Sequence, residues 1–244
     1  MIAVAAWCFI VALLGTSIGL ILGTIRLPIL LLVSSSPAAG AGANVGISTV
    51  AAATAAARHV RHGTVNWKLV LWMTPPSVIG ALIGGYVSGR IASNTLLIAI
   101  GCLLVYFGLR TLFGGRGTRA ARPESPRMQP AVIWGLGIGL LGGLVGLILG
   151  TLRVPALIQR IGETPYRAVA TNLVIGFWLG LAAVIGHLSS GVDWGLMLIG
   201  SAASIPGAIL GSRITGRLSE RQLLNAIAVA LLISGTLTAA RGAL

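Results

Sequence analysis

The feature that most constrains this chain is a decapeptide that occurs twice. It reads GLILGTIRLP at residues 19–28 and GLILGTLRVP at residues 146–155, with eight of the ten letters identical. Each copy places glycines, one arginine and a final proline inside apolar sequence. Glycine weakens a helix, and proline removes one of its hydrogen bonds. We therefore expect a broken helix at each copy, in a chain made of two similar halves.

The rest of the sequence indicates that these helices lie in a membrane. Hydrophobic residues make up 56% of the chain and charged residues 9%, with a mean hydropathy of +0.96. Soluble domains carry about 25% charged residues. Long apolar runs recur from end to end, and one spanning helix needs roughly 20 such residues. We predict an all-α polytopic membrane protein.

The formal net charge of +13 does not indicate a nucleic-acid-binding protein. The basic residues mostly lie between the apolar runs, as membrane topology requires, and no nucleic-acid-binding signature accompanies them. Cys8 and Cys102 each stand alone in apolar sequence, without the spacing of a metal site. We expect no nucleic-acid partner, no metal and no cofactor.

The two halves align almost without gaps over residues 15–112 and 142–239. We divide the chain into a first transmembrane repeat (1–113), a basic cytoplasmic linker (114–130) and a second transmembrane repeat (131–244). Each repeat begins with an interrupted apolar segment, at 2–35 or 131–159. Three helices follow, at about 44–60, 68–90 and 94–113 in the first repeat and at about 168–188, 194–215 and 221–240 in the second.

We expect each break to separate one helix from a half-helix. The first helix should end near Gly23 and the half-helix should start near Pro28, because proline is well tolerated in a first helical turn. The same is expected at Gly150 and Pro155. The glycines at four-residue spacing, Gly15, Gly19 and Gly23 as well as Gly80 and Gly84, are expected to form faces for close helix packing.

The loop charges favour an inverted arrangement of the two repeats. Loop 35–43 has no lysine or arginine, whereas its counterpart 160–167 has two arginines. Loop 58–68 has three basic residues, whereas its counterpart 187–193 has none. By the positive-inside rule the repeats then face opposite ways, a common plan for secondary transporters. A parallel arrangement of two four-helix halves is the alternative.

The breaks also suggest an anion site. An arginine inside a membrane segment is costly and points to function, and its planar donors suit oxyanions. The N-terminus of the following half-helix favours an anion as well. The candidate substrate-binding residues are Arg26, Arg153, Thr24, Thr151, Asn44, Asn172, Gly23, Gly150, Pro28 and Pro155.

Each polar candidate has a structural alternative. The arginines could extend to the membrane surface or bind lipid headgroups. The asparagines could cap the next helix. The threonines could satisfy the backbone at the break. His59 and His187 occupy matching positions and are candidates for a proton-linked role, with a polar helix end as the alternative.

The acidic residues bear on the mechanism. Glu124, Glu163, Asp193 and Glu220 are expected in loops or at helix ends, so no buried carboxylate is expected to bind a coupling ion. Moving one charge through the membrane potential is worth ~2.3 kcal/mol per 100 mV. Potential-driven export of an anion, by alternating access around the paired breaks, therefore needs no such ion. The alternative is an importer coupled to Na⁺ or H⁺.

The duplicated motifs resemble the sulfite exporter TauE/SafE family. The Gly-rich phrase ends in proline, a stretch from proline to asparagine follows (37–44 and 165–172), and then comes HGTVNW or SGVDW. Their order and duplication carry the resemblance over nearly the whole chain. It implies a multi-pass carrier of the bacterial inner membrane, not an enzyme, for anions such as sulfite or organosulfonates. The partners are then a small anion and the lipid bilayer, and the glycine faces also permit a homodimer.

Overall fold

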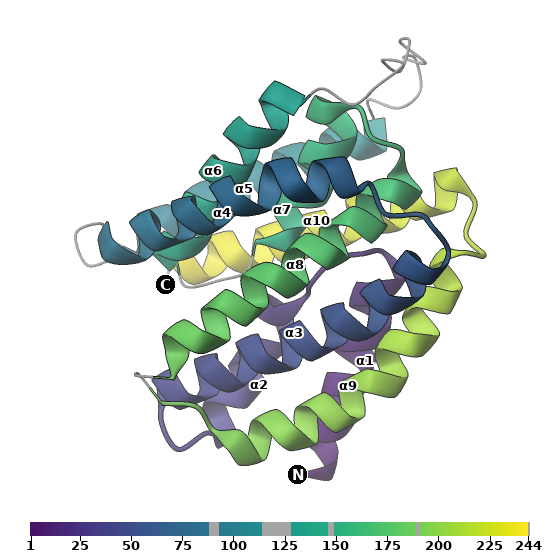
Figure 1. Cartoon of the computed structure of the whole chain (residues 1–244). Helices are drawn as coiled ribbons and strands as arrows, with labels where there is room; N and C mark the ends of the chain where they lie inside the picture. The colour runs from purple at the N-terminus through teal and green to yellow at the C-terminus, as the bar shows by residue number, and fades with distance from the viewer. Residues whose placement is uncertain (88–92, 114–127, 146–148, 189–190, 244) are drawn as a thin grey trace. The chain divides into compact units, whose positions relative to one another are not determined.

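The computed structural model describes residues 1–87, 93–113, 128–145, 149–188 and 191–243 (Figure 1). Over these ranges the chain forms helices joined by short loops, and the described residues contain no strand. The prediction of an all-helical protein is confirmed. Most of the expected basic linker, residues 114–127, lies outside the described residues.

The first break separates α1 (Ile2–Ser17) from α2 (Gly23–Val33). Gly19 has φ +68°, and Leu20 N donates to Gly15 O at 2.8 Å while Gly19 N donates to Thr16 O at 3.4 Å. This is the left-handed glycine ending of a helix, in which two carbonyls of the last turn find donors beyond it. The expectation that α1 ends near Gly23 was wrong, because Gly19 ends the helix four residues earlier.

The half-helix also starts earlier than expected. Residue Pro28 lies inside α2 rather than at its start, with Gly23 as the first helical residue. The N–H groups of a first helical turn have no intrahelical partner, so a proline just beyond that turn removes only one hydrogen bond. The second break shows the same correction, because α7 (Gly150–Ala156) starts at Gly150 and contains Pro155.

The second interrupted segment differs from the first in its ending. It consists of α6 (Met128–Val145), then α7, then the π-helical turn η3 (Leu157–Ile161). Gly162 has φ +89° and ends η3 in the left-handed conformation. Residues 146–148 lie outside the described residues.

The remaining helices follow the expected order: the helix at 194–215 has the expected bounds, and the others start earlier than expected. The remaining helices are α3 (Pro37–Arg61), α4 (Trp67–Val87), α5 (Ser93–Phe113), α8 (Pro165–His187), α9 (Trp194–Thr215) and α10 (Glu220–Ala243). The expected start of α3 near residue 44 was wrong, because Ser36 caps the helix by accepting from Ala39 N and Pro37 is its first residue. Proline at that position is pre-organised for a helix.

The described helices form two compact units, each of which contains parts of both sequence halves. Unit 1 comprises residues 1–65 and 169–217, and unit 2 comprises residues 66–168 and 218–244. In unit 1, α9 packs along α1 and α3. A Cβ at Gly207 would lie 2.5 Å from Phe9 O of α1, so the glycine allows close approach of these two helices.

In unit 2, α4 packs along α6, and α5 packs along α10. Cβ atoms at Gly80 and Gly84 of α4 would collide with Leu136 O and Leu140 O of α6. The expectation that these two glycines form a packing face is confirmed. By contrast, Gly19 ends a helix in the left-handed conformation and also lies against Val169, so this position requires both the backbone freedom and the small size of glycine.

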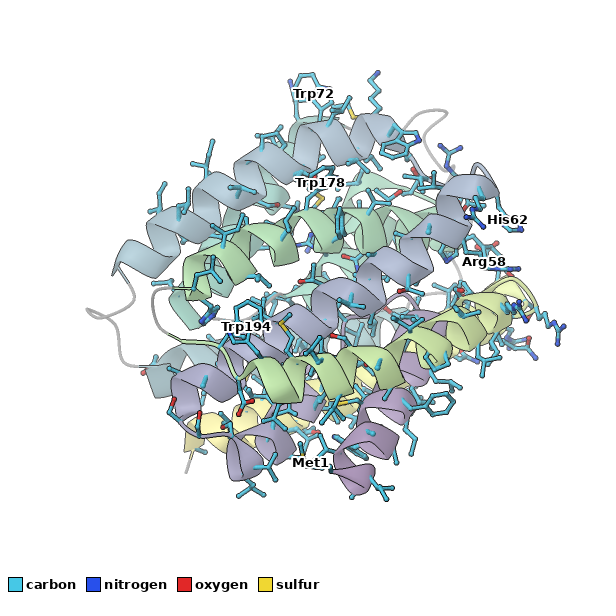
Figure 2. The ribbon with its side chains drawn as sticks, turned by 60° about the horizontal axis from the view of Figure 1, so that its bottom comes forward. Met1, Arg58, His62, Trp72, Trp178 and Trp194 are labelled. Atoms are coloured by element: carbon cyan, nitrogen blue, oxygen red, sulfur yellow. The ribbon has the colours of Figure 1, made fainter. Side chains whose placement is uncertain are left out.

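Several helices match the dimensions of a bilayer. Among the described residues, α8, α9 and residues Glu220–Ala240 of α10 are long and apolar enough to cross a membrane. Shorter apolar helices include Ile2–Ser17 and Gly23–Val33. Arg58 and His62 lie together at the C-terminal end of α3 (Figure 2), where the basic loop was expected.

The ending of α1 makes a stability prediction. Gly19→Ala should destabilise the protein by about 2–4 kcal/mol, because it forces φ +68° on alanine and drives a Cβ into the Val169 side chain. Gly63→Ala is the matched control, since Gly63 has φ +65° but nothing lies within 4 Å of its Cβ position. Its cost should be only about 1 kcal/mol. Thermal unfolding in detergent measures both, and equal losses would contradict the role of close packing at Gly19.

Candidate functional site at the helix breaks

The first break carries a buried arginine. Arg26 is the fourth residue of α2, and its side chain is 2% exposed. Burial of a charge is costly unless it is paired, and the positive end of a helix dipole disfavours a cation further. No carboxylate of the described residues forms a salt bridge with Arg26. A buried position also does not fit an arginine that extends to the membrane surface.

Neutral oxygens of α3 hold the Arg26 guanidinium instead. Its Nε donates to Asn44 Oδ1 at 2.9 Å, and its Nη2 donates to Asn44 O at 2.9 Å and to Ser48 Oγ at 2.5 Å. Asn44 Nδ2 donates to Gly23 O at 3.2 Å, and Ser48 Oγ donates to Asn44 O at 2.8 Å. This network fixes the orientation of the arginine without neutralising its charge.

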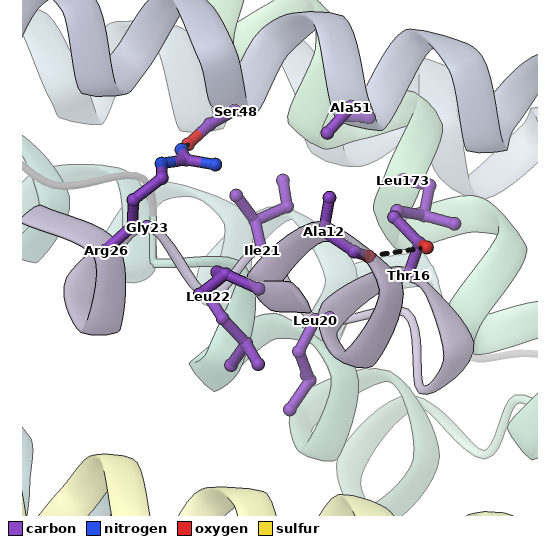
Figure 3. Close-up of a pocket in the computed structure, with 13 residues that line it drawn as sticks. Ala12, Thr16, Leu20, Ile21, Leu22, Gly23, Arg26, Ser48, Ala51 and Leu173 are labelled. Atoms are coloured by element: carbon purple, nitrogen blue, oxygen red, sulfur yellow. Dashed lines mark hydrogen bonds between the residues drawn. The ribbon is translucent and has the colours of Figure 1, made fainter. Parts of the chain in front are cut away.

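The same network leaves one end of the guanidinium available. Arginine has five N–H donors, and the three on Nε and Nη2 are used. The structure records no partner for Nη1 among the described residues. Arg26 lines a cavity of about 20 Å³, room for roughly one water molecule (Figure 3).

The remaining wall of this cavity is mainly apolar. Arg26 is the one charged residue among the residues that line it. The hydroxyl of Thr16 faces the cavity, but it donates to Ala12 O at 2.8 Å and is 3.3 Å from Ala208 O. The apolar wall comprises Val11, Ala12, Leu20, Ile21, Leu22, Ala51, Ala52 and Leu173. The cavity therefore has one cationic end and a hydrocarbon body.

The second candidate asparagine also contacts the first break. Asn172 is fully buried in α8, and its Nδ2 donates to Gly19 O at 2.7 Å. Asn44 and Asn172 both lie seven residues after the proline that starts their helix, so neither is a cap. The capping alternative was wrong for both, because the proline starts each helix two turns earlier. Each amide instead donates to a backbone carbonyl at the break between α1 and α2.

The second set of candidates lies together in unit 2. Arg153 is 1% exposed and Thr151 is 2% exposed, both on the short helix α7. Gly150 is the first residue of α7 and Pro155 is its sixth. The buried arginine of the second break therefore matches Arg26 in burial and in its place within the half-helix.

The other candidates lie outside the Arg26 network. Thr24 is the second residue of α2, and Pro28 lies further along this helix. His59 is buried in the last turn of α3, with its Nδ1 3.2 Å from Thr64 Oγ1. His187 is the last residue of α8.

Two polar residues of the structure were not expected. Ser48 follows Asn44 by one helical turn, and this spacing could have identified it as a partner of Arg26. The corresponding residue of the second half is Gly176, so the duplication does not point to Ser48. Glu163 was expected in a loop or at a helix end, and it does lie between η3 and α8, yet it is only 4% exposed. Its position in a loop is as expected, whereas its burial was not expected.

Comparison with known proteins identifies the family. The model of the sulfite exporter TauE/SafE family matches residues 4–238, so the chain belongs to this family. The probable membrane transporter protein YunE of Bacillus subtilis is 24% identical over 85% of this chain and 84% of its own length. The probable membrane transporter protein YjnA of the same bacterium is 25% identical over 92% and 97%.

A third relative is the probable inner membrane transporter protein TsaS of Comamonas testosteroni. It is 25% identical over 71% of this chain and 74% of its own length. No solved structure matches the chain significantly. The protein is thus a membrane transporter of the TauE/SafE family.

The Arg26 network makes a prediction about two neighbouring hydroxyls. Ser48→Ala should destabilise the protein by about 1–3 kcal/mol more than Thr49→Ala, because it removes an acceptor from a buried charged donor. Thr49 is the matched control, since its hydroxyl donates only to Val45 O of the same helix, at 2.8 Å. Thermal unfolding of the two variants measures the difference. Equal losses would show that Ser48 contributes nothing to holding Arg26.

Proposed function

We propose that this transporter exports small sulfur-containing anions, sulfite or organosulfonates, across the bacterial inner membrane. The anion binds at the break between α1 and α2, and access alternates between the two faces of the membrane. Two inverted repeats, each with a broken helix and three further membrane-crossing helices, provide the movement. This is the plan of many secondary transporters, in which discontinuous helices form the substrate site.

One observation carries the proposal. Arg26 is buried, no carboxylate of the described residues pairs with it, and its Nη1 faces a cavity. A buried cation held only by neutral groups stays uncompensated, so an anion that enters the cavity gains a charge-assisted hydrogen bond. The start of α2 adds further attraction for negative charge.

The packing of the helices supports the repeats. In the alignment of the two sequence halves, α6 is the counterpart of α1 and α9 is the counterpart of α4. The structure packs α1 with α9 and α6 with α4. Each pair therefore joins one helix from each half, and the two pairs correspond to one another, as expected for two copies of one repeat.

The chemistry of the cavity favours an anion with one apolar side. Nη1 can donate to oxygens at one end only, and most of the wall is hydrocarbon. An oxygen that is buried without a hydrogen-bond donor is costly, and sulfite would place some of its oxygens against the apolar wall. An organosulfonate has its oxygens at one end. Since the cavity of about 20 Å³ is smaller than either anion, the site has to widen to bind it.

One observation supports a second candidate function. Glu163 is a buried carboxylate, the kind of group that binds a coupling ion in Na⁺- or H⁺-driven carriers. An importer of a small sulfur compound coupled to such an ion is the alternative. We favour export, because the membrane potential alone drives an anion outward with ~2.3 kcal/mol per charge and 100 mV.

Flux into and out of proteoliposomes under an imposed potential tests the proposal. Sulfite and methanesulfonate should move toward the positive side, with methanesulfonate preferred. Arg26→Ala should lower the flux by about tenfold to a hundredfold, the value of one lost charge-assisted hydrogen bond. Arg26→Lys should not restore it fully, because lysine lacks the planar donors that Asn44 and Ser48 hold.

Arg58→Ala is the matched control, because it removes a basic residue from the end of α3 that is far along the helix from Asn44. Normal flux in Arg26→Ala would mean that the arginine is structural and that the anion binds elsewhere. Flux that ignores the potential but follows a Na⁺ or H⁺ gradient would support the importer.

A further inference from the structure

The π-helical turn η3 of unit 2 contacts the end of α5 and, through it, the start of α6. Gln159 Nε2 donates to Thr111 Oγ1 at 2.7 Å and to Phe107 O at 3.4 Å, both in the last two turns of α5. The ring of Phe107 lies 5.8 Å from the ring of Trp134 in α6, measured between centroids. These contacts hold η3 beside two helix ends.

The start of α4 meets η3 through Glu163. This residue lies two positions after η3, and its Oε2 accepts from Nδ2 of Asn66, the residue before α4. Asn66 Oδ1 accepts from Leu69 N at 3.3 Å, so Asn66 also caps this helix. Arg167 Nε lies 3.6 Å from Glu163 Oε1. We call this part of unit 2 the η3 junction: residues 157–167, the end of α5 and the starts of α4 and α6.

Three further basic side chains belong to the η3 junction. Arg160 is part of η3, Arg110 precedes Thr111 in α5, and Lys68 is the second residue of α4. All three are exposed. Over the described ranges, no carboxylate forms a salt bridge with any of them, because Glu163 is paired with Arg167. The junction therefore presents positive charge that the protein does not neutralise.

The guanidinium of Arg160 is held in one orientation. Its central carbon lies over the Trp134 ring, 5.7 Å from the centroid. The ring attracts the cation and restricts a side chain that is otherwise free in solvent. No hydrogen bond to the N–H groups of Arg160 is recorded within the described part of the chain. These planar donors match the oxygens of a phosphate, and the stacking orients them before a ligand binds.

The surface beside these basic residues is aromatic and then aliphatic. Trp67 and Trp72 of α4 are exposed, and Trp72 projects outward from its helix (Figure 2). Tyr106, one turn before Arg110 in α5, is exposed as well. Leu82 lies exposed further along α4. Tryptophan and tyrosine collect at the level of lipid headgroups, whereas aliphatic side chains face the acyl chains.

We propose that the η3 junction binds the phosphate of an anionic phospholipid. Arg160 donates to the phosphate, Arg110 and Lys68 add positive charge, and the acyl chains lie along the exposed apolar side of α4. By the positive-inside rule an end with these basic residues faces the cytoplasm, where anionic lipids attract basic groups beside a membrane helix. A free anion has no acyl chains to use the neighbouring apolar surface. Lipid binding at this site does not depend on the proposed function.

Native mass spectrometry of the whole protein in an uncharged detergent tests this site. The dissociation constant of phosphatidylglycerol is compared with that of phosphatidylcholine of the same chain length. Phosphatidylglycerol should bind more tightly, because the trimethylammonium group of phosphatidylcholine is repelled by the arginines. Arg160→Ala should raise the dissociation constant of phosphatidylglycerol about tenfold, through the loss of a charge-assisted hydrogen bond. Trp134→Leu should raise it about threefold, because Arg160 keeps its charge but loses its orientation.

Arg61→Ala is the matched control. Arg61 is an exposed arginine at the end of α3, and the described residues include no aromatic ring stacked on it. Its removal lowers the net charge by the same amount and should change the dissociation constant by less than about twofold. Equal weakening by Arg61→Ala and Arg160→Ala would reduce the effect to general charge attraction and overturn the site. Equal binding of the two lipids to the unmodified protein would overturn it as well.

Inorganic phosphate distinguishes a lipid headgroup from a free ion. At constant ionic strength, phosphate should not displace phosphatidylglycerol at an equal concentration, because it lacks the acyl chains. Displacement under these conditions would indicate a site for phosphate ions and overturn the assignment to a lipid. The measurement involves no transported anion, so its outcome is independent of the flux measured for sulfite and methanesulfonate.

Discussion

The structure of unit 1 depends on how a buried arginine is held. Arg26 has a full charge in a position where burial and the dipole of α2 both disfavour it. Neutral oxygens from Asn44 and Ser48 satisfy three of its donors and leave Nη1 facing the cavity. A carboxylate in their place would have neutralised the charge on which the proposed anion binding depends. A reversible anion site needs a positive charge that no carboxylate of the protein neutralises.

The backbone of the break makes this arrangement possible. Gly19 ends α1 in a left-handed conformation, so the chain can turn and start a new helix at Gly23. The carbonyls released at the break find donors in side chains, because Asn44 donates to Gly23 O and Asn172 donates to Gly19 O. Irregular backbone inside a membrane has to be satisfied by protein or water, and two buried amides do this here.

Much of the candidate site could be predicted from the duplication in the sequence. Arg26 and Asn44 each recur in the second half, which makes them candidates, and the structure places them in contact. Ser48 was missed because it has no counterpart there. The predicted ends of the broken helices are wrong because the left-handed conformation of Gly19 ends α1, whereas the prediction rested on the proline. The burial of Glu163 could not be predicted, since it depends on how distant segments pack.

The most direct test is the position of a bound anion. Crystals grown with 2-bromoethanesulfonate would give an anomalous signal from bromine together with density for the sulfonate. The account predicts a sulfonate oxygen within hydrogen-bond distance of Arg26 Nη1 and the bromine against the apolar wall formed by Ala51, Ala52 and Leu173. A sulfonate bound elsewhere, with the Arg26 cavity unchanged, would contradict it.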